Sequence, residues 1–377
     1  MAHWRGLHDK GRGAGASVGD SPSKSFAKER RWLPQAPKPT SGQLCLLGVA
    51  FLWGTYAPAL RFLYGLPGPP CPAALTAVRT LIQSSVLLAS AVAQGMGSLE
   101  GRPQVSSNGA NVRSKEGAGG AGGGLRQALN FVAPTLLVGG LELGLWNFAA
   151  SSTQALGLEF TTATRAAFLI QATALLTPVL ASLSGERPGR AVWTGCGVAL
   201  LGTLLLTLDH APPAAVSANA TPIAIGGDAC IFVSAFFFSL ATVRLGKLAS
   251  SFPTLRLAAA KSVVMALIAA GWLGTSALGQ VTSGQPVTAL WQGYADPLAW
   301  GAILWASLGP GALAAFLQTQ GQSSVPAAQS QVIFSSLPLW SALFAVLLLN
   351  ETLGPLGWVG GLSIVGAGLI ASRGKSA

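Results

Sequence analysis

The sequence predicts an all-α integral membrane protein with ten transmembrane helices arranged as two inverted five-helix repeats. Three observations carry this prediction: long apolar windows without charge, basic loops separated from acidic ones, and an internal repeat. Half of the 377 residues are hydrophobic and 9% are charged, against roughly 25% charged residues in soluble domains. A soluble core cannot use that much apolar chain, so the body of the protein is expected to lie in lipid.

Long windows of the chain contain no Asp, Glu, Lys or Arg, among them 297–350 and 352–372. A helix needs about 20 apolar residues to cross a hydrocarbon core of about 30 Å. The window 297–350 therefore holds two spans, separated by the polar stretch 318–324. The predicted spans are 43–64, 72–94, 129–151, 160–183, 190–208, 222–243, 254–279, 298–318, 325–349 and 354–372.

Two polar segments and two repeats organise the chain. Residues 1–42 form a basic tail whose composition is typical of disorder; it is compatible with an organellar transit peptide and equally with a plain cytosolic tail. Residues 96–128 form a Gly-rich flexible loop. The first repeat is predicted at 43–208 and the second at 222–372.

Basic residues gather on one side of the predicted spans. With the N-terminus inside, the inside segments carry the Lys and Arg residues of the loops, whereas the outside loops carry Asp209, Asp296 and Glu351. Basic residues near span ends stay on the side from which the chain inserts. Both termini are therefore expected on the cytosolic or stromal side, which requires an even number of spans.

The two halves are related by an offset of 165 residues, which aligns Glu186 with Glu351 and Trp193 with Trp358. Five spans per half is an odd number, so the halves must enter the membrane in opposite directions. Arg187 follows the first Glu, and no basic residue follows the second before the next span, which agrees with inversion. Inverted repeats recur in secondary transporters, with the substrate near the midplane between them.

Several motifs resemble the EamA family of the drug/metabolite transporter superfamily: WGTYAPALRFLY, PAALTAVRTL, ALGLEFTTATRAAFL, and a GE or NE pair with Trp seven residues later. The resemblance covers about 43–372 and implies a ten-helix carrier that exports or exchanges small organic solutes. The stretch FLIQATALLTPVLASLSGERP is most similar to plant, algal and cyanobacterial members, which favours a plastid envelope. Asn350 and the long loop 96–128 depart from the family pattern without disturbing the fold.

Ionisable groups inside spans are costly and are therefore functional candidates. Glu142 lies 13 residues into the third predicted span, about 20 Å at helical rise and close to the midplane. Trp146 lies one turn further on the same face, beside Asn147. Glu142 is interpreted either as a proton or substrate site or as the partner of a buried cation that holds helices together.

Arg79 and Lys261 occupy nearly matching places in the second span of each half, seven residues after Pro72 and eight after Pro253. A pair of cations flanking a central cavity would suit a carboxylate or a phosphate. The alternative is that both side chains snorkel to the interface.

A second group of candidates is neutral. Gln171 and Gln331 lie in the fourth and ninth spans, where helix packing is the alternative to substrate contact. Trp53 is interpreted either as a wall of the cavity or as a packing residue.

The expected function is secondary transport of a small organic metabolite, with proton or ion coupling and a homodimer left open. A nucleotide-sugar or triose-phosphate carrier is the first alternative, and a non-transporting receptor or scaffold on the same fold is the second. No enzyme, cofactor or metal is expected, because catalytic clusters, Cys/His ligand spacings and an ATP-binding GxxxxGK[ST] are not found. The net charge of +11 comes without a nucleic-acid-binding signature.

Overall fold

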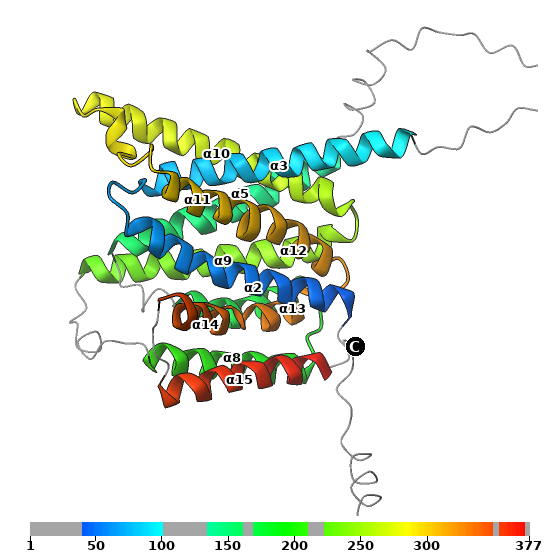
Figure 1. The fold of residues 1–377 in the computed structure, drawn as a ribbon. Helices are drawn as coiled ribbons and strands as arrows, with labels where there is room; N and C mark the ends of the chain where they lie inside the picture. Colours follow the sequence, from blue (N-terminus) through cyan, green and yellow to red (C-terminus); the bar gives the residue numbers. More distant parts are fainter. Residues whose placement is uncertain (1–39, 101–133, 161–168, 210–221, 350–353, 374–377) are drawn as a thin grey trace, which may run out of the picture. The chain divides into compact units, whose positions relative to one another are not determined.

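The chain is all-helical wherever its placement is described, and no strand occurs among the described residues. The basic tail and most of the predicted loop 96–128 lie outside the described residues, so the transit peptide and the loop stay predictions. The computed structural model describes residues 40–100, 134–160, 169–209, 222–349 and 354–373 (Figure 1).

The helices follow the order of the predicted spans. The first half contains α2 (Ser41–Tyr64), α3 (Pro72–Glu100), α5 (Pro134–Phe160), the short 3-10 helix η2 (Ile170–Ala172) leading into α7 (Thr173–Leu183), and α8 (Arg190–Asp209). The second half contains α9 (Pro222–Ala249), α10 (Thr254–Thr282), the 3-10 turn η4 (Val287–Leu290), α11 (Pro297–Ser307), the π-helical turn η5 (Leu308–Leu313), α12 (Ala314–Gln322), α13 (Ala327–Phe334), α14 (Leu337–Leu349) and α15 (Pro355–Arg373).

Membrane insertion is supported by length and apolarity. Five helical stretches of the described chain are long and apolar enough to cross a bilayer. They are Ser41–Tyr64, Pro72–Gly95, Gly226–Ala249, Thr254–Thr282 and Pro297–Gln322, and shorter apolar helices occupy Ile170–Leu183, Arg190–Leu205 and Pro355–Ala371. The all-α membrane fold is thus confirmed, while the exact number of ten spans stays a prediction.

The third helix differs from the predicted span. The sequence predicted a break between the spans 129–151 and 160–183, but α5 continues through Gln154 to Phe160. No Pro interrupts residues 147–160, so nothing forces the helix to end. In the second half, Pro326 does stop the chain from continuing as one helix between α12 and α13. The predicted loop also begins late, because α3 runs on to Glu100.

The ninth predicted span is broken into two helices. Its first part, α13, ends at Phe334, and α14 begins at Leu337 after a turn at Ser335 and Ser336. Pro338 lies in the first turn of α14, where it has no N–H to donate to the preceding helix. This segment therefore combines 8-residue and 13-residue helices.

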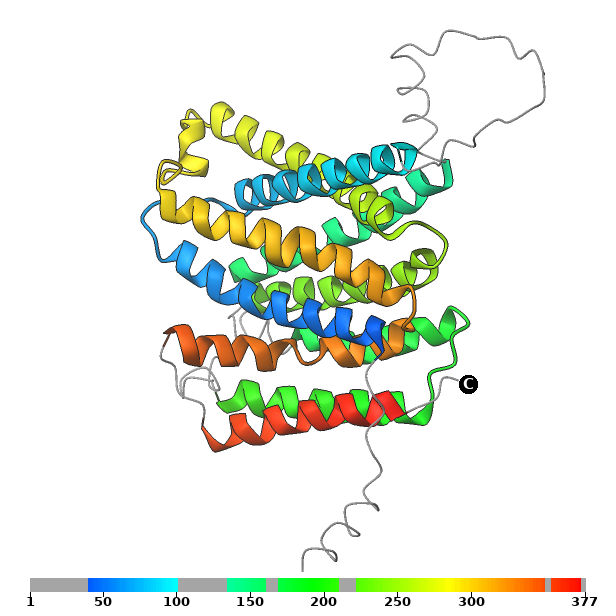
Figure 2. The same cartoon turned by 45° about the vertical axis from the view of Figure 1, so that its right-hand side comes forward.

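Helix pairing brings the two halves together. Helix α8 packs along α15, α3 along α10, and α5 along α9, and the first two pairs lie side by side in both views (Figures 1 and 2). Gly195 of α8 faces Ala367 of α15, and Gly202 faces Gly360. Residue numbers increase along α8 while those of the facing residues on α15 decrease, so these two helices are antiparallel.

Helices α5 and α10 run parallel to each other. Gly140 faces Ala260, and Gly144, one turn later, faces Val264. A Cβ atom on Gly144 would lie 2.6 Å from the Cβ of Val264, which is closer than packed carbons can approach. Small residues at i and i+4 allow this close approach of backbones, as is common in membrane helices.

The turn after α2 is tied to the turn before α11. The Gly293 N–H donates to the carbonyl of Gly68 at 2.7 Å, and the Cys71 N–H donates to that of Leu290 at 2.8 Å. Gly68 has φ +65°, a conformation that favours glycine. We refer to these two hydrogen bonds as the loop clasp.

Candidate functional site

Polar side chains inside the helices gather in three clusters. One joins α3, α10 and α12, a second joins α5 and α9, and a third joins α7 and α13. Each cluster contains at least one residue that the sequence predicts as a candidate. In each, hydrogen bonds connect helices from different halves of the chain.

The first cluster is centred on Lys261 of α10. The side chain is buried, with 6% of its surface exposed, so it does not snorkel to an interface. Its Nζ donates to Oε1 of Gln318 on α12 at 3.2 Å. Among the described residues, no carboxylate pairs with this ammonium.

Arg79 of α3 belongs to the same cluster. Its Nη1 lies 3.5 Å from Oε1 of Gln83, a distance at the limit of a hydrogen bond. The guanidinium carbon lies 5.6 Å from the ring centre of Tyr56 on α2, a cation–π contact. Its Nε is buried without a hydrogen-bond partner in the described structure. Gln83 Nε2 in turn donates to Ser262 Oγ of α10 at 3.0 Å.

These contacts bring the two predicted cations toward one level of the bundle. Arg79 and Gln83 are four residues apart, about 6 Å of helical rise, and Lys261 is the neighbour of Ser262, to which Gln83 is bonded. The sequence predicted these two cations as a pair, and the structure links both to the crossing of α3 and α10.

The π-helical turn η5 lies beside this crossing. A Cβ on Gly311 would come 2.9 Å from Gln83 Oε1, so a larger residue at this position would force that amide to shift. The indole Nε1 of Trp53 donates to the carbonyl of Pro310 at 3.2 Å. Trp53 also contacts Phe334 with ring centres 5.2 Å apart. Single π turns occur frequently at functional sites.

The second cluster is an ion pair between Glu142 of α5 and Arg244 of α9. Arg244 Nη2 donates to Glu142 Oε2 at 2.8 Å, and its Nε donates to the other carboxylate oxygen. This two-bonded geometry is the strong form of an Arg–carboxylate pair. The side chains are partly open, with 25% of Glu142 and 37% of Arg244 exposed.

Glu142 lies before the middle of its helix. It follows Pro134, the first residue of α5, by eight residues, or about 12 Å, and the middle of the helix is residue 147. The predicted span 129–151 had its middle at residue 140, whereas α5 runs from Pro134 to Phe160. Asn147 is the residue at the middle of the helix, and its Nδ2 donates to the carbonyl of Leu143 at 2.7 Å.

Trp146 stands between the ion pair and the helix centre. Its ring stacks on Phe237 of α9, with ring centres 5.7 Å apart and planes inclined by 16°. Its indole Nε1 is buried and has no hydrogen-bond partner in the described part of the chain. The stacked rings lie next to the charged pair, where this N–H is close enough to Glu142 to stabilise its carboxylate.

The third cluster holds α7 against α13. Gln331 Nε2 donates to Thr173 Oγ1 at 3.0 Å, and Thr177 Oγ1 donates to Gln331 Oε1 at 3.3 Å. Both ends of this amide are thus occupied by side chains of the opposite half. Gln171 is buried in η2. The geometry of Gln331 agrees with its packing interpretation.

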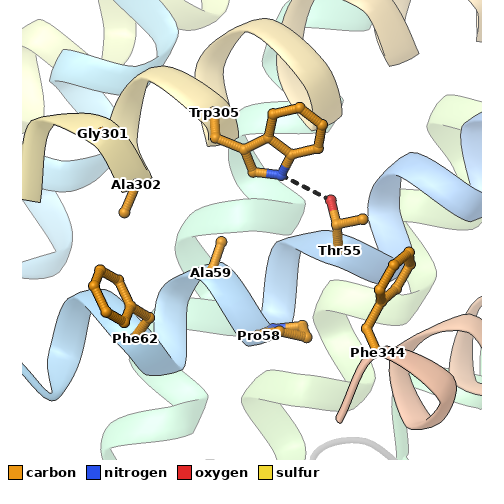
Figure 3. Close-up of a pocket in the computed structure, with 8 residues that line it drawn as sticks. All are labelled: Thr55, Pro58, Ala59, Phe62, Gly301, Ala302, Trp305 and Phe344. Atoms are coloured by element: carbon orange, nitrogen blue, oxygen red, sulfur yellow. Dashed lines mark hydrogen bonds between the residues drawn. The ribbon is translucent and has the colours of Figure 1, made fainter. Parts of the chain in front are cut away.

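An apolar groove opens between α2, α11 and α14 (Figure 3). Its volume is about 480 Å³. Trp305 Nε1 donates to Thr55 Oγ1 across it at 3.0 Å, and Phe62 and Phe344 lie at its two ends in the picture. The predicted site residues do not line it.

Sequence reasoning missed Arg244, Gln83 and Gln318. Arg244 was assigned to a loop because the span was ended at residue 243, whereas α9 continues to Ala249. Gln83 follows Arg79 by four residues, a spacing that places both on one helix face and could have been noticed. Gln318 could not be identified, since only the packing of α12 on α10 brings it to Lys261.

Comparisons with known proteins agree with this architecture. No curated protein matches the chain. Twenty-nine chains of solved structures match, among them one described as "Crystal structure of protein", with 20% identity and a TM-score of 0.65. The match covers 88% of this chain and 96% of that one, and at this identity it shows the fold alone. Residues 225–373 match the EamA-like transporter family model. The resemblance seen in the sequence is thereby confirmed for residues 225–373, the part of the chain that is similar to the EamA-like transporter family.

Proposed function

We propose that this protein is a secondary transporter that moves a small organic metabolite by alternating access between two inverted repeats. The match of residues 225–373 to the EamA-like transporter family model supports membrane transport. The observation that carries the finer proposal is the antiparallel packing of α8 and α15, the last helix of each half. Equivalent helices run in opposite directions only if the halves are inverted.

The helix pairs support the same symmetry. Under this symmetry each helix has an equivalent in the other half, and a contact between two helices should recur between their equivalents. The contact α2–α12 recurs as α9–α5, α14–α2 as α7–α9, and α11–α3 as α5–α10. The pairs α3–α10, α7–α13 and α8–α15 convert into themselves. An axis relating the halves would pass through these three pairs.

Interrupted helices lie near this axis in both halves. The fourth segment begins as the 3-10 helix η2 before α7, and the ninth is split between α13 and α14. Gln171 precedes Pro178 by seven residues, as Gln331 precedes Pro338. Discontinuous helices at the interface of inverted repeats are typical of substrate sites in transporters.

Membrane orientation follows from the same proposal. Both termini lie on the cytosolic or stromal side, because the basic loops are on that side. A plastid envelope remains part of the proposal on the resemblance to plant and algal members. Ion coupling and a homodimer are open within it.

The test is flux through the purified full chain in vesicles. A library of small metabolites is offered with and without a proton gradient, and empty vesicles give the background. We expect uptake of at least one solute, and exchange when the same solute is loaded inside. No flux for any solute, together with a co-purifying partner protein, would favour the receptor or scaffold function instead.

Alternating access has its own test at the ends of α7 and α9. Lys247 of α9 donates to the carbonyl of Ser184 after α7 at 2.6 Å, so cysteines at these positions lie within reach of a short bifunctional thiol reagent. In a protein whose native cysteines are replaced, bridging Ser184→Cys to Lys247→Cys should stop flux, and each single variant should remain active. Full flux in the bridged protein would show that this end does not open.

A further inference from the structure

Two cations inside the helices, the buried Lys261 and the half-buried Arg79, lack a carboxylate partner among the described residues. The ammonium group of Lys261 donates one hydrogen bond, to the neutral amide of Gln318. Arg79 has one weak bond to Gln83, one aromatic contact, and a buried Nε with no acceptor. Buried charge without a counter-charge is costly in a protein interior and more so in a membrane.

The contrast with the second cluster is informative. Glu142 and Arg244 are more exposed than Lys261, yet they are paired by two hydrogen bonds. The chain therefore supplies a carboxylate where the cation is partly open, and none where the cation is buried. A missing anion is the simplest complement to the cluster around Lys261.

We propose that Lys261 and Arg79, positioned by Gln318 and Gln83, bind the carboxylate of a small organic anion at the crossing of α3 and α10. This inference rests on the proposed transport function and names its substrate class. The ammonium offers its two remaining donors, and the guanidinium offers its unused Nε. Tyr56 and Trp53 of α2 supply aromatic surface nearby for the organic part.

Charge argues for a carboxylate rather than a sugar nucleotide. Residues 297–372, which run from the start of α11 to the last residue of α15 but one, carry no Lys or Arg. The cluster therefore offers two positive charges, which match an anion of one or two negative charges. A polyphosphate group would need more cations.

Gln83 and Gln318 are positioning residues in this proposal. Each amide lies next to one cation: Gln83 joins α3 to α10 across the two halves, and Gln318 joins α12 to α10 within the second half. Ser262 and Gly311 fix the amide of Gln83 from either side. An arriving carboxylate would replace an amide oxygen as acceptor without requiring the cations to move far.

The experiment measures binding without transport. The melting temperature of the purified full chain is recorded with propionate, succinate, propionamide and inorganic phosphate at equal ionic strength. Ligands that bind only the folded state raise it. We expect a rise with a carboxylate and none with propionamide, the neutral analogue. A rise with phosphate alone, or an equal rise with propionamide, would overturn the carboxylate assignment.

Variants locate the effect. Lys261→Met should abolish the rise caused by carboxylates and leave the ligand-free melting temperature unchanged or higher by ~2–4 °C, because an unpaired buried charge is removed. Lys261→Arg should retain part of the response. Lys247→Met, which removes an exposed cation on α9, is the matched control and should respond like the original chain.

Opposite results separate this inference from the transport function. If Lys261→Met lowers the ligand-free melting temperature and still responds to carboxylates, Lys261 is structural and the inference is wrong, whatever flux the protein shows. If Lys261→Met does not fold, Arg79→Met and Gln318→Leu provide the same comparison. A carboxylate response that depends on Lys261 but comes with no flux would keep the site and reject transport.

Discussion

Glu142 is a residue whose interpretation depends on its neighbour. Alone in an apolar span it would be a proton site, but Arg244 of the next half of the chain holds both of its oxygens. The structure thus provides the cation that the packing interpretation required. Each charge stabilises the other, and removal of one leaves its partner without a counter-charge.

We expect Glu142→Gln to lower the free energy of unfolding by about 1–3 kcal/mol, since the guanidinium loses its charged acceptor. Arg244→Gln should have a similar effect. The double variant should cost less than the sum of the two, which a double-mutant cycle of thermal unfolding in detergent would reveal. Additive costs would mean that the two side chains are not coupled.

At the scale of helices, glycines set how closely neighbouring helices pack. Gly202 of α8 lies so close to α15 that an added Cβ would be 2.7 Å from the carbonyl oxygen of Gly360. Gly197, on the same helix, has nothing within 4 Å of such an atom. Both glycines lie in α8, and they differ in what an added Cβ would contact.

Gly202→Ala is predicted to destabilise the protein by about 1–3 kcal/mol, the usual cost of overpacking. Gly197→Ala should be neutral or stabilising by up to about 1 kcal/mol, because Ala favours the helix. Melting temperatures of the two purified variants provide the comparison. Equal effects would indicate that α8 and α15 are not packed closely at Gly202.

At the scale of the whole molecule, orientation in the membrane can be measured. Ser250, after α9, and Ser283, after α10, are both exposed and lie at opposite ends of α10. In a protein with its native cysteines replaced, Ser283→Cys should react with an impermeant thiol reagent added outside. Ser250→Cys should react only after the membrane is permeabilised. The reverse pattern would place the termini outside.

Much of the architecture could be predicted from the sequence, because apolar length and loop charge report directly on insertion. The places of Arg79 and Lys261 in their helices followed from Pro72, the first residue of α3, and Pro253, the N-cap of α10. Their partners did not follow, because contact between α10 and α12 depends on tertiary packing. The third span was ended at residue 151 instead of Phe160, since polar residues inside a helix give no local sign of where the helix ends.

The loop clasp has a consequence for movement. Its two backbone hydrogen bonds join the turn between α2 and α3 to the turn that leads into α11. Backbone bonds of this kind do not depend on side chains, so we expect these three helix ends to move together. In the proposed transport cycle, a hinge would then lie elsewhere in the bundle.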